Sequence, residues 1–131
     1  MKRLLTAILM TAVIAALTAC GSANESAAGY EQVSTSEAVA LMESEEDYII
    51  LDVRTAEEYE QGHIPDAVNV PVETIGDEEI AALPDKEQLI LVYCRSGNRS
   101  KTASAKLAEN GYKNIVEFGG INSWTGEVVT D

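Results

Sequence analysis

The sequence predicts an α/β fold in which a small, open and mostly parallel sheet is flanked by helices on both faces. Short apolar runs typical of buried strands recur along the chain, at 48–53, 67–70, 89–93 and 115–118. Helix-like segments with capping residues separate these runs, and the connecting loops are short. Strands that alternate with helices in this way pair in parallel, and the helices pack against the sheet.

The predicted domain begins with a short strand and a helix. Residues 30–33 alternate in polarity, which indicates a strand. The polar run 34–37 supplies capping residues for the helix that follows. The apolar side chains of that helix are Ala38, Val39, Leu41 and Met42. An acidic, solvent-exposed loop is expected at 43–47.

The next strand, at 48–53, is strongly apolar. Thr55 and Glu58 then have the spacing of a capping box, which predicts a helix that Gly62 ends. A short strand at 67–70 follows.

The second half of the chain repeats the alternation. A helical turn or two is predicted at 77–83, ended by Pro84. The strand at 89–93 is the most apolar of the set, a helix is predicted at 100–110, and a Gly-Gly pair ends the last strand at 115–118.

The loop after the central strand carries the residues suited to chemistry. It begins at Cys94, and up to Ser100 it contains only small, polar or cationic side chains. Backbone N–H groups in such a loop can converge on one point, and the positive end of the next helix adds to them. Open parallel sheets form their sites outside the carboxyl ends of the strands, where Asp52 and Gly119 are also expected. We therefore predict a nucleophilic cysteine in an anion-binding cradle.

The charge distribution favours the same place. The chain has 9 Lys and Arg against 22 Asp and Glu, a net charge of −13, yet residues 88–108 contain no acidic side chain. The cations of this stretch are Arg95, Arg99, Lys101 and Lys106. Nearby cations lower the pKa of a thiol and make it a better nucleophile. The plainer alternative is a buried structural cysteine. The overall negative charge argues against nucleic-acid binding.

The N-terminal segment predicts export. Lys2 and Arg3 precede an apolar stretch at 4–17. This stretch is shorter than the roughly 20 apolar residues that a transmembrane helix needs. The sequence Leu-Thr-Ala-Cys that ends at Cys20 resembles the bacterial lipobox, whose cysteine becomes the lipid-modified first residue of the mature protein. The resemblance implies a protein anchored outside the bacterial cytoplasmic membrane, or in the periplasm or outer membrane.

These features divide the chain into three parts. We expect a lipoprotein signal peptide at 1–19, the lipidated Cys20 with a flexible tether at 20–29, and one folded domain at 30–131. Lipidation of Cys20 would leave Cys94 as a single free thiol.

Several segments, taken together and in order, resemble the rhodanese-type sulfurtransferase domain. They span nearly the whole predicted domain and correspond to the N-terminal signature, the active-site loop and the C-terminal signature of that family. The matching residues are 51–54, 57–59, 62–69, 93–100, 118–120 and Trp124.

The resemblance implies an enzyme that needs no cofactor. Cys94 would attack the outer sulfur of a donor such as thiosulfate or a persulfide, and the resulting cysteine persulfide would pass its sulfur to a thiol or cyanide. The loop residues that would bind the substrate or the persulfide are Arg95, Ser96, Gly97, Asn98, Arg99 and Ser100. Arg95 would attract the anionic donor, whereas Arg99 would either tie the loop together or bind the donor.

The remaining candidates have supporting roles. Asp52 and Arg54 are expected to form a structural or rim ion pair. His63, the only histidine, is expected to be a hydrogen-bonding anchor, and Trp124 a packing residue. No cluster of residues predicts a metal site.

Two other functions stay open. A cysteine-dependent phosphatase would also place Cys and Arg at the two ends of an anion-binding loop, but that loop has one residue more than the four between Cys94 and Arg99. A persulfide carrier or recognition module without turnover would use the same residues as the enzyme. No particular protein partner is predicted.

Overall fold

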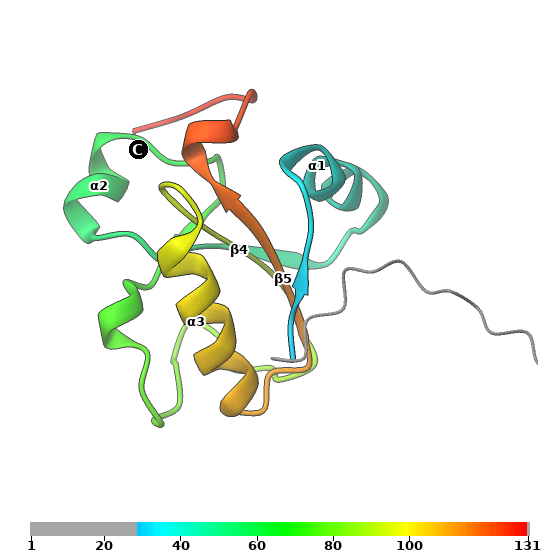
Figure 1. The fold of residues 1–131 in the computed structure, drawn as a ribbon, viewed down its shortest axis with the longest axis vertical. Coiled ribbons are helices and arrows are strands. Elements are labelled where there is room, and N and C mark those ends of the chain that lie inside the picture. The colour runs from blue at the N-terminus through cyan, green and yellow to red at the C-terminus, as the bar shows by residue number, and fades with distance from the viewer. Residues whose placement is uncertain (1–28, 131) are drawn as a thin grey trace, which may run out of the picture.

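The computed structural model describes residues 29–130, which form one five-stranded sheet in the order β1-β5-β4-β2-β3, with every neighbouring pair parallel (Figure 1). The predicted parallel α/β architecture is confirmed. The strands are β1 (Glu31–Gln32), β2 (Tyr48–Asp52), β3 (Val68–Asn69), β4 (Leu89–Cys94) and β5 (Asn114–Gly120). The predicted signal peptide, Cys20 and all of the predicted tether except Gly29 lie outside the described residues.

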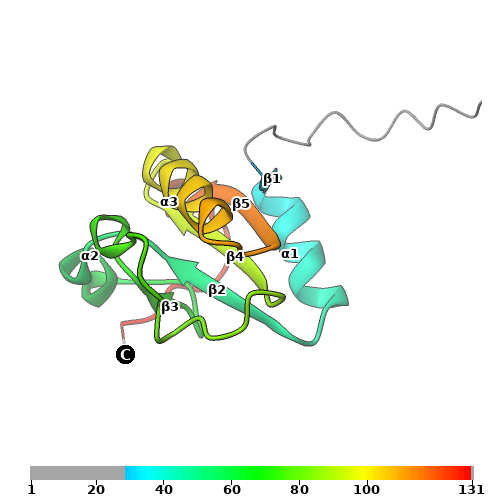
Figure 2. The same cartoon turned by 90° about the horizontal axis from the view of Figure 1, so that it is seen from below.

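Helix α1 covers one face of the sheet and α3 the other (Figure 2). The helices are α1 (Thr35–Ser44), α2 (Ala56–Gln61) and α3 (Asn98–Glu109), with 3₁₀ turns η1 (Val72–Thr74) and η2 (Ile121–Ser123). The predicted capping box of Thr55 and Glu58 begins α2, and Ser34 and Glu37 form another at α1. Each box satisfies N–H groups that a helix start leaves without partners.

The central strand β4 is buried on both faces, which explains its unbroken apolar run. Alternate side chains of the strand point to opposite sides. Val92 and Cys94 therefore join the core under α3, whereas Leu91 and Tyr93 join the core under α1. This alternation places the thiol on the α3 side of the sheet.

The prediction of a helix at 77–83 is wrong. The stretch consists of bends and turns, with a hydrogen bond from the N–H of Leu83 to the carbonyl of Ile80. Ile75 and Leu83 are buried separately in the α3-side core, and this packing decides the path of the chain.

Several element boundaries differ from the prediction by one or two residues, and two of these differences affect the cysteine loop. Helix α3 begins at Asn98 rather than at Ser100, because Gly97 takes a left-handed conformation (φ 115°) as its N-cap. Strand β5 continues through the Gly-Gly pair, and Gly120 pairs with Cys94.

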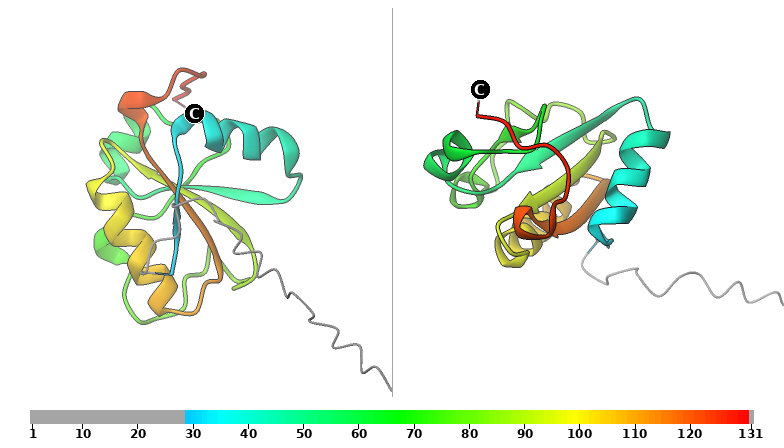
Figure 3. Two further views of the ribbon diagram at one scale, coloured as in Figure 1. Left: turned by 45° about the vertical axis from the view of Figure 1, so that its right-hand side comes forward. Right: turned by 90° about the horizontal axis from the view of Figure 1, so that it is seen from above.

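The segment after η2 returns to the turn that follows α2 (Figure 3). His63 and Val129 exchange backbone hydrogen bonds of 2.8 and 2.9 Å in an antiparallel bridge. The tail thus closes over the carboxyl edge of the sheet. Within residues 29–130, none of the helices has the length and apolar character needed to span a bilayer.

Candidate active site

The carboxyl ends of the central strands meet at one edge of the sheet, as predicted. Asp52, the last residue of β2, is in register with Tyr93, and Cys94, the last residue of β4, is in register with Gly120. The ladder between β4 and β5 shifts register between Val92 and Cys94. This irregularity ends regular pairing at the residue that carries the thiol.

The thiol of Cys94 lies inside the loop that follows it, with only 1% of the residue exposed. Its Sγ accepts the backbone N–H of Gly97 at 3.0 Å and lies 3.5 Å from the Ser100 hydroxyl. Burial raises the pKa of the thiol, but hydrogen bonds from Ser100 and from the backbone N–H groups of Gly97 and Ser96 outweigh it, so the Cys94 pKa is lowered. Hydrogen-bond donors, more than the predicted cations, are therefore the main cause of this lowering.

The loop depends on close approach to β5. A Cβ added at Gly120 would overlap the carbonyl group of Arg95. The same carbonyl accepts the N–H of Asn122 at 3.1 Å. The Gly-Gly pair, which was predicted to end the last strand at the site edge of the sheet, therefore lies in direct contact with the loop.

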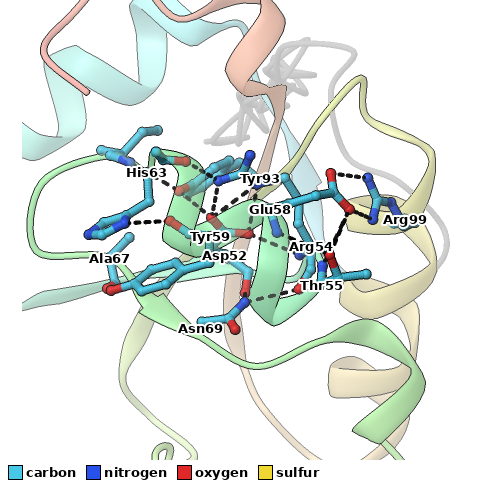
Figure 4. Close-up of polar contacts among 12 residues, drawn as sticks. Asp52, Arg54, Thr55, Glu58, Tyr59, His63, Ala67, Asn69, Tyr93 and Arg99 are labelled. Atoms are coloured by element: carbon cyan, nitrogen blue, oxygen red, sulfur yellow. Dashed lines mark hydrogen bonds and ion pairs between the residues drawn. The ribbon is translucent and has the colours of Figure 1, made fainter. Parts of the chain in front are cut away.

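Arg99 is tied to α2. Its two terminal nitrogens donate to the two carboxylate oxygens of Glu58 at 2.6 and 3.0 Å (Figure 4). The hydrogen bonds from Arg99 lower the pKa of Glu58 to about 2. Glu58 also closes the capping box of α2, so one carboxylate joins the starts of α2 and α3. This geometry favours the loop-tying role over the donor-binding role of Arg99.

The exposed residues of the loop face solvent at the rim of the site. Arg95, Ser96 and Asn98 are exposed, and Arg95 lines an open cleft of about 410 Å³ together with Arg54 and Glu58. The same cleft is bordered by Ile121, Asn122 and Val128. Arg54 is paired with Asp52 and Glu58 is paired with Arg99, so Arg95 gives this cleft its positive charge in an otherwise acidic protein.

Asp52 and Arg54 form a buried ion pair with a closest N–O distance of 2.7 Å, as expected for a structural pair (Figure 4). Asp52 also accepts the hydroxyl of Tyr93 at 2.7 Å, and Arg54 donates to the carbonyl of Gly62 at 2.7 Å. Burial raises the pKa of Tyr93. The Tyr93 hydroxyl in turn accepts the N–H of Ile64 at 3.1 Å. The network thus fixes the loop after α2 against β2 and β4.

His63 is an anchor, as its position in the turn predicted. The residue is 2% exposed, its ring stacks on Tyr59 with 3.7 Å between centroids, and its Nδ1 lies 2.9 Å from the Tyr59 carbonyl. Trp124 packs against Phe118, and its indole N–H donates to the carbonyl of Glu127 at 2.9 Å. Both residues therefore have the structural roles expected of them.

The sequence analysis missed Glu117. This residue of β5 is 2% exposed, and its Oε1 lies 2.6 Å from the Ser100 hydroxyl and accepts the N–H of Gly119 at 2.8 Å. The signal was a single charged residue within the apolar run 115–118. Within residues 29–130, no group of three or more His, Cys, Asp or Glu side chains is placed to hold a metal ion.

Comparison with known proteins assigns the family. The family model of the rhodanese-like domain matches residues 34–127. This chain belongs to the rhodanese-like family. The matched region contains the cysteine loop, the ion pair of Asp52 and Arg54, and the Gly-Gly pair, so the resemblance derived from separate motifs extends over one continuous domain.

Two curated relatives of the rhodanese-like domain differ in their described roles. The chain is 37% identical over 71 residues to thiosulfate sulfurtransferase PspE of Escherichia coli, which covers 54% of this chain and 68% of that protein. It is 32% identical over 105 residues to the putative sulfur carrier protein YrkF of Bacillus subtilis, which covers 79% of this chain and 56% of that protein. These relatives support a sulfurtransferase-type function.

Among solved structures, a rhodanese with anions from E. coli superposes with a TM-score of 0.58 at 35% sequence identity. The superposition covers 64% of this chain and 99% of that one. The rhodanese fold of the chain is thereby supported by sequence and by structure.

Proposed function

We propose that this protein is an enzyme that takes a sulfane sulfur from a donor such as thiosulfate, holds it as a persulfide on Cys94, and transfers it to a thiol or to cyanide. The observation that carries the proposal is the seating of Cys94 Sγ within a loop whose N–H groups point at it. Such donors stabilise a thiolate before the reaction and a persulfide anion after it.

The first half-reaction is a displacement at sulfur. The Cys94 thiolate attacks the outer sulfur of thiosulfate, a bond forms between the two sulfurs, and the S–S bond of the donor breaks. Sulfite leaves with the electron pair, so no external oxidant is needed. Arg95, at the rim of the cleft, attracts the dianionic donor.

The second half-reaction returns the enzyme to its starting state. A thiolate or cyanide attacks the outer sulfur of the Cys94 persulfide and departs as a persulfide or thiocyanate. The bond to Sγ breaks, and Cys94 leaves as a thiolate. The N–H of Gly97, which Sγ already accepts at 3.0 Å, favours this leaving group.

The position of Arg99 supports sulfur transfer over phosphoester hydrolysis. A phosphatase loop needs its arginine to hold the phosphate oxygens, whereas both terminal nitrogens of Arg99 donate to Glu58. The loop is also one residue shorter than that of a phosphatase. It therefore suits a compact sulfur centre better than a phosphate ester.

A persulfide carrier without turnover is the second candidate, favoured by the likeness to a putative sulfur carrier protein. The carrier and the enzyme share the first half-reaction. They differ in whether a small acceptor such as cyanide removes the sulfur in repeated cycles.

The test uses the full chain and follows the tryptic peptide 87–95, which separates Cys94 from Cys20. Thiosulfate is expected to add one sulfur atom to this peptide, cyanide to remove it, and Cys94→Ser to abolish the change. Repeated production of thiocyanate supports the enzyme, and a stable persulfide without turnover supports the carrier. An unchanged mass from a reduced thiol, together with phosphoester hydrolysis that Cys94→Ser abolishes, would establish the phosphatase instead.

We also propose that the protein is exported and held at a membrane by lipid on Cys20. The basic start, the short apolar stretch and the Leu-Thr-Ala-Cys ending support this proposal. Metabolic labelling with a radioactive fatty acid in a bacterial host should mark the protein, and Cys20→Ala should remove the label. Equal labelling of the variant would exclude Cys20 as the modified residue.

A further inference from the structure

A cavity of about 280 Å³ lies on the α1 side of the sheet and shares no lining residue with the cleft beside Arg95. Its lining includes the buried side chains of Ile50 and Ile64. Both residues belong to the core under α1, whereas Cys94 belongs to the core under α3. The cavity is therefore a feature that the proposed sulfur chemistry does not use.

Aromatic side chains extend the apolar lining of this cavity. Tyr48, Trp124 and Met42 all border it, and all three are half-buried. Trp124 is the only tryptophan of the chain, and its position is fixed by Phe118 and by the hydrogen bond from its indole N–H to the carbonyl of Glu127. The tryptophan ring attracts an ammonium group more strongly than the other aromatic rings do.

The charged side chains of the cavity are acidic. Asp66 comes from the turn that follows α2 and Glu127 from the tail that follows η2, and both are exposed. Among the described residues that line the cavity there is no Lys or Arg, and neither carboxylate forms an ion pair within residues 29–130. A ligand in this cavity would contact apolar and aromatic side chains inside it and negative charge at its rim.

The backbone at Asp66 is a second, independent observation. The N–H of Ala67 donates to the carbonyl of Ile64 at 3.1 Å, Pro65 is the second residue of the turn, and Asp66 has a φ of 67°. This is the pattern of a type II turn, whose third position favours glycine. Among the described residues, Asp66 is the only one other than glycine with a positive φ. The turn thus accepts backbone strain while keeping a carboxylate beside the cavity, and such strain is concentrated at binding sites.

We propose that this cavity binds a small aliphatic amine as its ammonium ion. The alkyl chain packs on the apolar lining, and the ammonium group stays at the rim near Asp66, Glu127 and Trp124. At the rim the ion keeps part of its hydration, which avoids the cost of burying a charge. The volume is just below the range of about 300–1,000 Å³ that is typical of sites for drug-sized molecules, so the ligand has few heavy atoms.

The test titrates the full chain with n-butyl-, n-pentyl- and n-hexylammonium and follows the fluorescence of Trp124. The single indole N–H signal in the NMR spectrum is the second readout, because the chain has one tryptophan. Both signals should change and saturate. The affinity should rise about two- to fourfold with each added CH₂ group, since the alkyl chain is buried.

Two ligands of the same length separate charge from apolar contact. Hexanol has no charge and should bind about fivefold more weakly than hexylammonium or worse, and hexanoate should not bind, because the carboxylates repel it. Added salt should weaken hexylammonium and leave hexanol unchanged. Cys94→Ser should bind hexylammonium as the wild type does, because the thiol lies on the other side of the sheet.

Three variants assign the rim. Asp66→Asn keeps a side chain that tolerates a positive φ but removes the charge, and it should weaken hexylammonium about fivefold without affecting hexanol. Glu127→Gln should have a similar effect. Asp66→Gly also relieves the backbone, so it should weaken hexylammonium while the Tm stays the same or rises. The control is Glu109→Gln, which removes an exposed charge from α3 on the opposite face and should change neither affinity nor signal.

Several results would overturn the proposal. They are an absence of change in both Trp124 signals, equal affinities for hexanol and hexylammonium, and a Glu109→Gln effect as large as that of Asp66→Asn, which would mean attraction to the acidic surface as a whole. None of these measurements involves a sulfur donor or acceptor. The outcome therefore tests the amine site alone and leaves the proposed function to its own experiment.

Discussion

Arg99 and Glu58, 41 residues apart in sequence, form a two-point ion pair that fastens the end of the cysteine loop to the first turn of α2. The pair favours one of the two roles that the sequence leaves open for this arginine. A guanidinium whose terminal nitrogens both contact a carboxylate is held in one direction, which suits fixing the loop better than binding the donor.

The first prediction concerns the stability of this pair against pH. Glu58 has a pKa of about 2 in the folded protein, below the ordinary 4.5, so the ionised form stabilises the fold. The stabilisation is fully present above pH 4.5 and is lost as the pH falls through 2. Urea unfolding should give a free-energy difference between wild type and Glu58→Gln of about 1 kcal/mol or less at pH 7, since the pair is partly exposed.

The control for this prediction is the exposed pair of Lys113 and Glu87. Glu87→Gln should change the free energy of unfolding less than Glu58→Gln does. A Glu58→Gln difference that stays constant from pH 7 to 2 would show that the carboxylate charge contributes nothing.

The second prediction concerns the buried ion pair of Asp52 and Arg54. Asp52→Asn leaves the Arg54 guanidinium buried without its counter-charge, which should cost about 3–5 kcal/mol in the free energy of unfolding. Tyr93→Phe removes only a hydroxyl from the same network and should cost less, about 1–3 kcal/mol. Chemical denaturation of both variants gives their free energies of unfolding and shows which substitution costs more. If the tyrosine variant is the less stable, the ion pair is not the centre of the network.

The third prediction concerns the contact between the cysteine loop and β5. Gly120→Ala places a methyl group against the Arg95 carbonyl, so the loop must shift and the N–H groups around Sγ must move with it. We expect a loss of about 1–3 kcal/mol in stability and a greatly reduced rate of persulfide formation. Gly76→Ala, where a Cβ meets nothing within 4 Å, is the matched control and should behave like wild type. Full activity in Gly120→Ala would mean that the loop geometry is not needed.

The elements that were predicted correctly are those whose sequence pattern lies within a few neighbouring residues. The capping box of Thr55 and Glu58 and the apolar run of β4 each involve residues close in the chain, and both are present in the structure. The helix predicted at 77–83 failed because its outcome depends on distant packing. Ile75 and Leu83 are buried against a core made by other segments.

In the candidate site, too, features set by neighbouring residues were predicted and features set by distant contacts were not. Cys94 and its loop were found from residues that are adjacent in sequence, whereas the partner of Ser100 lies on another strand. Nothing local indicates that Glu117 faces the loop, because which residues lie opposite one another depends on the pairing of β4 with β5. A charged residue inside a strand covered on both faces is the pattern that could have pointed to it.

The last prediction concerns Arg95, the exposed cation at the rim of the cleft. An exposed guanidinium attracts a nearby anion by about 1 kcal/mol per unit charge, so Arg95→Ala should lower kcat/KM for thiosulfate by about fivefold or more through KM. The same variant should leave thermal stability unchanged, and it should weaken the dependence of kcat/KM on salt, because screening acts on the charge that has been removed. Lys101→Ala removes a cation that lines a different cavity, on the other side of the loop, and should have a smaller effect. Steady-state kinetics at low and high salt separate the two positions. An Arg95→Ala enzyme with the wild-type KM and salt dependence would show that the donor is drawn in by the backbone of the loop alone.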